Sequence, residues 1–175
     1  MTKIYSYTYM SLDGVMSNPE EWTPPYFSDD LSDDLARRLE SCSAMVLGTQ
    51  TYKEFAEFWP KQGKDVPFAD LNNSICKYVV SNSLKQADWN NSSIVQAGDL
   101  ASLKSQGDLH ITGSATLVKS LLELRLLDEI VILLFPVVLG KGKRVFDGID
   151  TTKIDLIDTK AFPDGVTCLT YRSTG

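Results

Sequence analysis

The sequence predicts an α/β protein built on a mostly parallel sheet, and two features of the chain predict that class. Residues 108–140 contain a short β-prone run, a Gly-Ser turn, an amphipathic segment and a second apolar run, which is the pattern of a βαβ unit with parallel strands. Short apolar runs alternate with helical patterns elsewhere, and an antiparallel hairpin closes the chain. We therefore expect about eight strands and about four helices.

The first 40 residues predict a strand, a long loop and a helix. Residues 3–10 alternate Ile, Ser and Thr with three tyrosines, which favours a strand with both faces covered. The segment 11–27 carries three prolines and no periodicity, so we expect a long loop of the kind that often lines a site. Ser28 can cap the helix that follows, whose apolar face is formed by Leu31, Leu35 and Leu39.

The middle of the chain alternates buried strands with helices. A strand over 44–47 leads into a second helix that Pro60 ends, and a strand over 76–80 follows a polar loop. A small strand near 94–95 and a short helix over 99–104 precede the βαβ unit. The helix of that unit has an apolar face made of Leu117, Leu121, Leu122 and Leu124.

The end of the chain completes the predicted sheet. Residues 128–135 form the second strand of the βαβ unit, and two alternating runs, 154–161 and 166–172, flank a Pro-Asp-Gly turn. That arrangement is typical of an antiparallel hairpin.

Composition limits the possible functions. The 175 residues are 43% hydrophobic with no compositional break, so residues 1–175 are expected to form a single domain. A net charge of -6 and a pI near 4.7 argue against nucleic-acid and acidic-membrane surfaces. The chain shows neither a membrane-spanning run nor a signal-peptide pattern, so we expect a cytoplasmic protein. Three cysteines and a single histidine do not make a metal site, and the cysteines are expected to be reduced and buried.

Three predicted strand ends carry glycine or small hydroxylated residues, and they suggest a ligand site. A glycine-containing turn that opens a helix exposes unpaired N–H groups, which can hold a phosphate or simply make a turn. Ligands bind at the carboxyl ends of strands in open parallel sheets, so the co-occurrence favours binding. The three segments are Gly48-Thr49-Gln50-Thr51, Ser81-Asn82 and Gly113-Ser114-Ala115-Thr116.

Several motifs in this order resemble one known family. They are SLDG after the first strand, LGTQTYKEFAEFWP, YVVSNSL, ITGSATLVKSLL, and LDE followed by PVVLGKGKRVF. The combination resembles stand-alone relatives of the reductase domain of the bifunctional riboflavin-biosynthesis deaminase/reductase. Those proteins share the dihydrofolate reductase fold, so the resemblance implies a three-layer fold of that type over residues 3–172.

The resemblance also implies an NADPH site. The nicotinamide ring would lie near Tyr9 and Met10, and the adenosine end near Ser81 and Asn82. The pyrophosphate would lie between two turns, which consist of Gly113, Ser114, Ala115 and Thr116 on one side and Gly48, Thr49 and Thr51 on the other. The family usually has an arginine where this chain has Thr49, and losing that guanidinium weakens discrimination for the phosphorylated cofactor. Asn82, Lys85 or the Lys141–Arg144 segment could compensate.

The substrate and the catalytic acid are less well defined by these motifs. Asp13 is the candidate proton donor, although an Asp before Gly is more often simply a turn residue. The resemblance aligns Trp22 with the loop tryptophan of dihydrofolate reductase, but Phe27 stands where that enzyme has its substrate-binding acid. The expected function is an NADPH-dependent reductase similar to 5-amino-6-(5-phosphoribosylamino)uracil reductase, acting on a small pyrimidine or pterin-type substrate. The alternatives are a non-catalytic nucleotide-binding or dimeric scaffold and a true dihydrofolate reductase.

Other conspicuous residues have structural interpretations. His110 lies within a strand and has no acidic partner at recognisable spacing, so it is expected to be a core or edge histidine. The aromatic residues of the second helix are expected to be mostly core, with one or two lining the pocket. The apolar run 130–140 is long for an exposed edge, which suggests that it is buried between the subunits of a homodimer.

Overall fold

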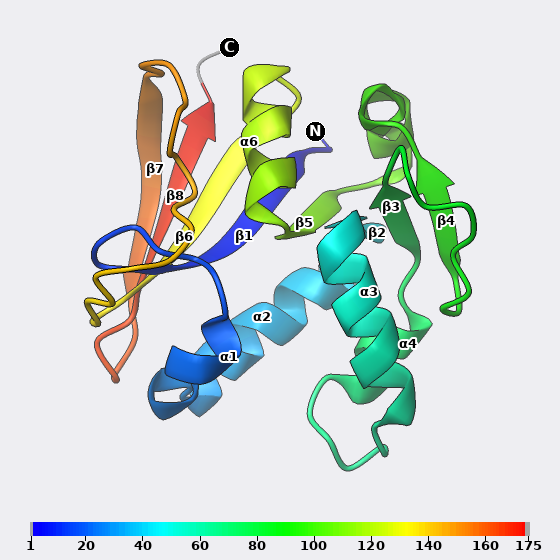
Figure 1. The fold of residues 1–175 in the computed structure, drawn as a ribbon. Helices are drawn as coiled ribbons and strands as arrows, with labels where there is room; N and C mark the ends of the chain where they lie inside the picture. The colour runs from blue at the N-terminus through cyan, green and yellow to red at the C-terminus, as the bar shows by residue number, and fades with distance from the viewer. Residues whose placement is uncertain (1, 174–175) are drawn as a thin grey trace.

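An eight-stranded sheet forms the centre of the computed structural model, which describes residues 2–173 (Figure 1). The strand order is β4-β3-β2-β5-β1-β6-β8-β7. All pairings are parallel from β4 to β6, and β8 and β7 are antiparallel. In chain order the strands are β1 (Ile4–Ser11), β2 (Ala44–Gly48), β3 (Lys77–Val80), β4 (Ser92–Val95), β5 (Leu109–Gly113), β6 (Glu129–Phe135), β7 (Ile154–Ala161) and β8 (Thr167–Ser173). The predicted α/β class, strand number and closing hairpin are confirmed.

Six α-helices occur among the described residues, where the sequence predicted about four. They are α1 (Pro19–Trp22), α2 (Asp29–Ser41), α3 (Thr49–Phe58), α4 (Ala69–Ser74), α5 (Leu100–Leu103) and α6 (Ala115–Glu123). The predicted loop 11–27 contains α1 and a 3-10 turn, and the polar loop before β3 contains α4. Both missed helices span only one or two turns, too few for a hydrophobic period to show. Figure 1 shows α6 crossing in front of the sheet, with α2, α3 and α4 along its lower side.

The strand at the centre of the sheet is β1, which pairs with β5 on one side and β6 on the other. The interior position of β6 corrects one expectation. The apolar run that contains it is not an edge, because β6 also pairs with β8. The free edges are β4 and β7, so the need to cover an edge at β6 no longer supports a dimer.

The two faces of the sheet carry different side chains, as the alternation in β1 predicted. On the α6 side, Ile4 packs with a mainly aliphatic cluster that includes Ile111 and Leu121. On the α2 side, Tyr5 and Tyr7 pack with aromatic residues and leucines. The apolar face of α6 is buried as expected except for Leu124, which is 57% exposed because it follows the last residue of the helix.

The three cysteines are free, as expected, but only Cys168 is fully buried, while Cys42 is half-buried and Cys76 exposed. Among residues 2–173 no helix is long and apolar enough to cross a membrane. The same residues contain no cluster of His, Cys, Asp or Glu suited to a metal ion.

Candidate functional site

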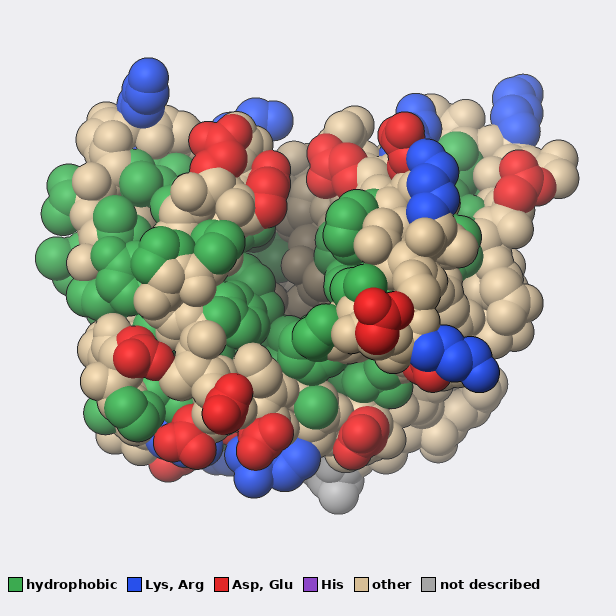
Figure 2. All heavy atoms as spheres, turned by 90° about the horizontal axis from the view of Figure 1, so that it is seen from below, with side chains coloured by type: hydrophobic (Ala, Val, Ile, Leu, Met, Phe, Trp, Pro, Cys, Tyr) green, Lys and Arg blue, Asp and Glu red, His purple; other side chains and the backbone are tan. Residues whose placement is uncertain are grey.

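A cavity of about 500 Å³ lies against the central strands, on the face covered by α2 and α3. Its lining comes from β1, β5, the segment 16–20, α2, α3 and the residues around α4. Figure 2 shows a hollow in this side of the molecule with apolar side chains on its walls and acidic side chains near its rim. The volume is in the range of small-molecule sites. Seven aromatic rings contribute to the lining: Tyr7, Tyr9, Phe27, Phe55, Trp59, Phe68 and His110.

Two helix-opening turns meet at one side of the cavity. β2 and β5 are neighbours, so the turn after Gly48 and the turn after Gly113 lie together. A Cβ added to Gly48 would lie 2.9 Å from Ser114 Oγ, and one on Gly113 would lie 3.1 Å from Thr51 Oγ1. The glycines therefore permit a contact that side chains would block. The first N–H groups of α3 and α6 thus lie close together, as the resemblance implied.

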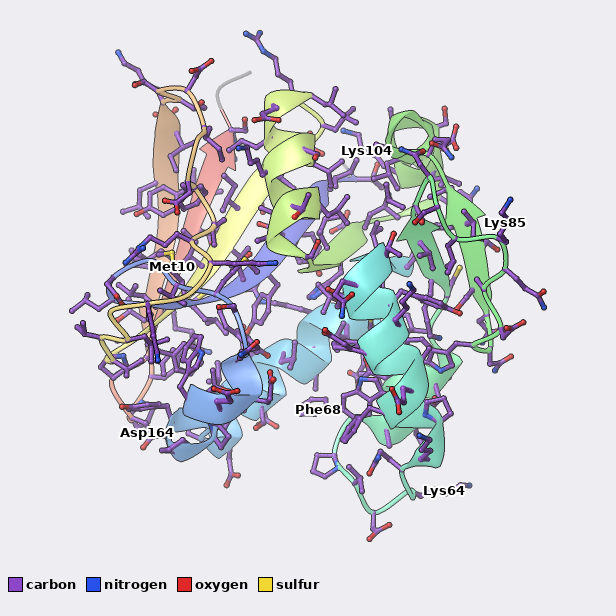
Figure 3. All side chains as sticks on the ribbon, in the orientation of Figure 1. Met10, Lys64, Phe68, Lys85, Lys104 and Asp164 are labelled. Carbon is purple, nitrogen blue, oxygen red and sulfur yellow. The ribbon has the colours of Figure 1, made fainter. Side chains whose placement is uncertain are left out.

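The third predicted strand end joins this arrangement through Thr49. Its hydroxyl donates a hydrogen bond of 2.8 Å to Ser81 Oγ, which also accepts from the N–H groups of Ser83 and Leu84. Ser81 is buried, whereas Asn82 and Lys85 are exposed on the β3–β4 connection (Figure 3). The position usually held by arginine is thus occupied by a hydroxyl that stabilises a neighbouring turn.

Some of the proposed cofactor residues line the cavity and others do not. Tyr9, Thr51, Gly113, Ser114 and Ala115 line it. Met10 instead packs against the aliphatic cluster on the opposite face (Figure 3), because adjacent residues of a strand point to opposite faces. Thr116 is exposed in the first turn of α6 and does not line the cavity.

The carboxylate of Asp13 is already engaged by several donors. It accepts hydrogen bonds from Ser11 Oγ at 2.7 Å and from the N–H groups of Leu139 and Gly140 at 3.1 and 2.8 Å. Arg144 lies 3.7 Å away. The Ser11 hydroxyl, followed by the two amides, lowers the pKa of Asp13 to about 2. Asp13 is not among the cavity-lining residues, and these contacts favour a role in fixing the segment 137–144 over proton donation.

His110 forms its hydrogen bond with the hydroxyl of Tyr5. The Tyr5 hydroxyl donates to the backbone oxygen of Arg38 at 3.2 Å, and His110 Nδ1 lies 3.1 Å from the same hydroxyl. With the hydroxyl hydrogen directed at Arg38, Nδ1 is the donor to the Tyr5 hydroxyl and Nε2 is an acceptor. Burial, reinforced by the charge of Arg38, lowers the pKa of His110 to about 3, so the ring is neutral. The predicted core histidine is thus also a cavity wall.

A buried carboxylate lies behind the tyrosines and was missed in the sequence. Asp34 Oδ2 accepts from Arg38 Nε at 2.8 Å and from the Tyr7 hydroxyl at 3.4 Å, and Lys160 of β7 lies 3.6 Å from Oδ1. Burial alone would raise the pKa of Asp34, but the hydrogen bond and charge of Arg38 outweigh it and hold the pKa below its usual value. The i, i+4 spacing of Asp34 and Arg38 was the available signal.

The aromatic walls were only partly predicted. Phe55 and Trp59 line the cavity and Tyr52 is buried in the core, in agreement with the mixed expectation for that helix, while Phe58 is 50% exposed. Phe68 was not anticipated. It has φ 67, a strained value for a side-chain-bearing residue, and its ring lies between α2 and the pair α3 and α4 (Figure 3).

Comparison with known proteins places this chain in one family. A curated relative, the uncharacterized protein YyaP of Bacillus subtilis (strain 168), is 25% identical over 145 residues, which cover 78% of this chain and 77% of YyaP. A putative riboflavin biosynthesis protein from Shewanella sp. PV-4 superposes with a TM-score of 0.79 at 20% identity, covering 99% of both chains. Dihydrofolate reductase from Enterococcus faecalis, complexed with NADP(H) and RAB-propyl, gives 0.65 at 15% identity, covering 99% of this chain and 97% of that one. The RibD C-terminal domain model matches residues 2–168, and the chain therefore belongs to the RibD C-terminal domain family.

Proposed function

We propose that this protein is an NADPH-dependent reductase of a small nitrogen heterocycle. The meeting of the α3 and α6 amino termini beside the cavity carries this proposal. The positive ends of two helices, with N–H groups of their first turns directed outward, suit the pyrophosphate of a dinucleotide. The likeness to a dihydrofolate reductase complexed with NADP(H) supports the same cofactor.

The residues present fit that cofactor. Gly48 and Gly113 leave room between the turns, while Thr51, Ser114 and Ala115 line the adjoining cavity. When bound, the nicotinamide would supply a hydride. The protein would hold the cofactor at the two turns, orient the substrate against the aromatic walls and exclude water from the cavity. Asp13 would keep the segment 137–144 in place, because its carboxylate bonds the amides of Leu139 and Gly140.

A cofactor titration with a matched pair of glycine variants tests the proposal. Gly48 has φ -75, so alanine is tolerated by the backbone, but its Cβ would press on Ser114 Oγ at 2.9 Å. Gly98 has no atom within 4 Å of an added Cβ. We expect NADPH to bind the wild type and Gly98→Ala equally and Gly48→Ala at least about tenfold more weakly. Fluorescence of the nicotinamide and thermal stabilisation would measure this, and equal binding by all three would exclude the site.

A homodimer stays a prediction. The surface best suited to form it is the edge strand β7 and not the apolar run 130–140. The edge strand β7 exposes Leu156 and Ile157, and an exposed apolar edge favours pairing with a second copy. Light scattering of the purified protein would decide, because a monomeric mass at working concentration would exclude the dimer.

A further inference from the structure

Several polar atoms line the cavity, and most of them can accept a hydrogen bond. With the Tyr5 hydroxyl donating to Arg38, His110 donates through Nδ1 and has Nε2 as an acceptor. Tyr7 donates its hydroxyl hydrogen to Asp34, so its oxygen can only accept a further bond. Thr112 Oγ1, which can accept, and Trp59 Nε1, which can only donate, are buried with no hydrogen-bond partner among the described residues. Both residues line the same cavity. Buried polar atoms are nearly always paired, which indicates that a ligand completes this set.

The rim of the cavity carries more negative than positive charge. Glu20 of α1 and Glu54 of α3 line it, and Lys143 is the one cationic side chain among the lining residues. Arg38 is engaged with Asp34, and Arg144 lies beside Asp13. Phosphate groups are bound by clustered cations or by helix amino termini. Both amino termini at this cavity, those of α3 and α6, are taken by the cofactor in the proposed function.

Flat aromatic surfaces enclose the space that remains. Tyr9 and Phe27 pack edge to face at 5.8 Å, and Phe55 and Trp59 do so at 6.1 Å. Phe68 closes the lower side between α2 and α4. A planar ring would stack on such walls, whereas a flexible sugar phosphate would leave them uncovered.

We infer that the substrate is a planar nitrogen heterocycle that donates N–H hydrogen bonds and carries no phosphate group. This inference rests on the proposed function, because it assigns the helix amino termini to the cofactor. It departs from the phosphorylated substrate named for the reductase that this chain resembles. Glu20 and Glu54 would disfavour a phosphate, while His110 and Tyr7 would accept from ring or amino N–H groups.

A matched pair of probes tests the inference. The probes are 5-amino-6-ribosylaminouracil and its 5′-phosphate, titrated calorimetrically at low ionic strength into protein saturated with NADP⁺, which cannot donate a hydride. We expect the phosphate-free probe to bind at least about fivefold more tightly, because the phosphate would face two carboxylates. Tighter binding of the phosphate, or no binding of either probe to a protein that binds NADP⁺, would overturn the inference and leave the proposed function standing.

Variants of Glu54 and His110 test whether these two residues recognise the probes. Glu54→Gln should reduce the difference between the probes about twofold or more, whereas Glu57→Gln, on the same helix but outside this cavity, should not change it. His110→Phe, checked for folding by circular dichroism, should weaken both probes alike by about tenfold through loss of the acceptor. Unchanged binding in Glu54→Gln and His110→Phe would overturn the assigned recognition. If NADP⁺ fails to bind but the free protein still prefers the phosphate-free probe, the proposed function is wrong. The inference that the ligand is a heterocycle without a phosphate group would then still stand.

Discussion

The central sheet has two unlike faces, although the same strands build both. Ile4, Leu109 and Ile111 turn toward α6 and belong to a mainly aliphatic cluster. Their adjacent residues Tyr5 and His110 turn the other way and form hydrogen bonds beside a cavity. Hence one face holds the fold together by burying apolar area, and the other keeps polar groups within reach of a ligand. Changes on the first face should affect stability alone, and changes on the second should affect stability and binding.

The largest expected effect lies on the aliphatic face. Leu121 of α6 is completely buried, so Leu121→Ala removes packing and leaves a void, which should lower the free energy of unfolding by about 2–5 kcal/mol. Leu124→Ala, at a residue that is 57% exposed, should change it by less than about 0.5 kcal/mol. Urea denaturation would measure both. Neither variant, while folded, should alter NADPH affinity, and a loss of affinity in Leu121→Ala would show that the two faces are not independent.

Asp34 tests the polar face, where charge and structure are coupled. Its side chain is 12% exposed and pairs with Arg38, whose side chain is 26% exposed. Asp34→Asn should lower the free energy of unfolding by about 1–3 kcal/mol, because the Arg38 charge loses its partner in a half-buried site. Asp33→Asn, at the exposed neighbouring residue, is the control and should be nearly neutral. The pKa of Asp34 lies below its usual value, so its contribution is present above the unfolded pKa and is lost as the pH falls below it.

His110 should make the free energy of unfolding depend on pH in a less acidic range than Asp34 does. It is the only histidine, and its pKa is about 3 in the folded protein against about 6.5 in an unfolded chain. Between these values the unfolded state binds the extra proton, so stability must fall as the pH falls, by up to about 1.4 kcal/mol per pH unit. Unfolding free energies measured from pH 7 to 5 would show this slope, and His110→Gln should flatten it. An unchanged slope in the variant would place its origin elsewhere.

The contrast between the faces also explains what the sequence could predict. Alternation in residues 4–9 and the glycine turns at Gly48 and Gly113 are local signals, so the strands and the order of elements were predictable. The meeting of the two turns was expected only from the resemblance to the reductase family. The cavity walls were not, because Phe68 reaches its place through a strained backbone before a short helix. Likewise the tautomer of His110 depends on Tyr5, which is 105 residues away. Contacts between residues so distant in the chain leave no local pattern.

The smallest expected effect concerns the choice between NADPH and NADH. The Lys141–Arg144 segment packs along residues 13–17, on the β1 and β6 side of the sheet, whereas Ser81 follows β3 on the other side. This segment therefore does not replace the missing arginine near Ser81. Asn82 and Lys85 remain from the sequence prediction, and Lys85 is the one that carries a positive charge. Because Lys85 is exposed, its pairing with a ribose phosphate should contribute no more than about 1 kcal/mol. Lys85→Ala should reduce the preference for NADPH over NADH by at most about fivefold.

Lys64→Ala, on the distant loop before α4 (Figure 3), is the control and should leave the preference unchanged. Titration of each variant with NADPH and with NADH would give the ratio of the two affinities. If that ratio is the same in Lys85→Ala and the wild type, Lys85 does not contact the phosphate.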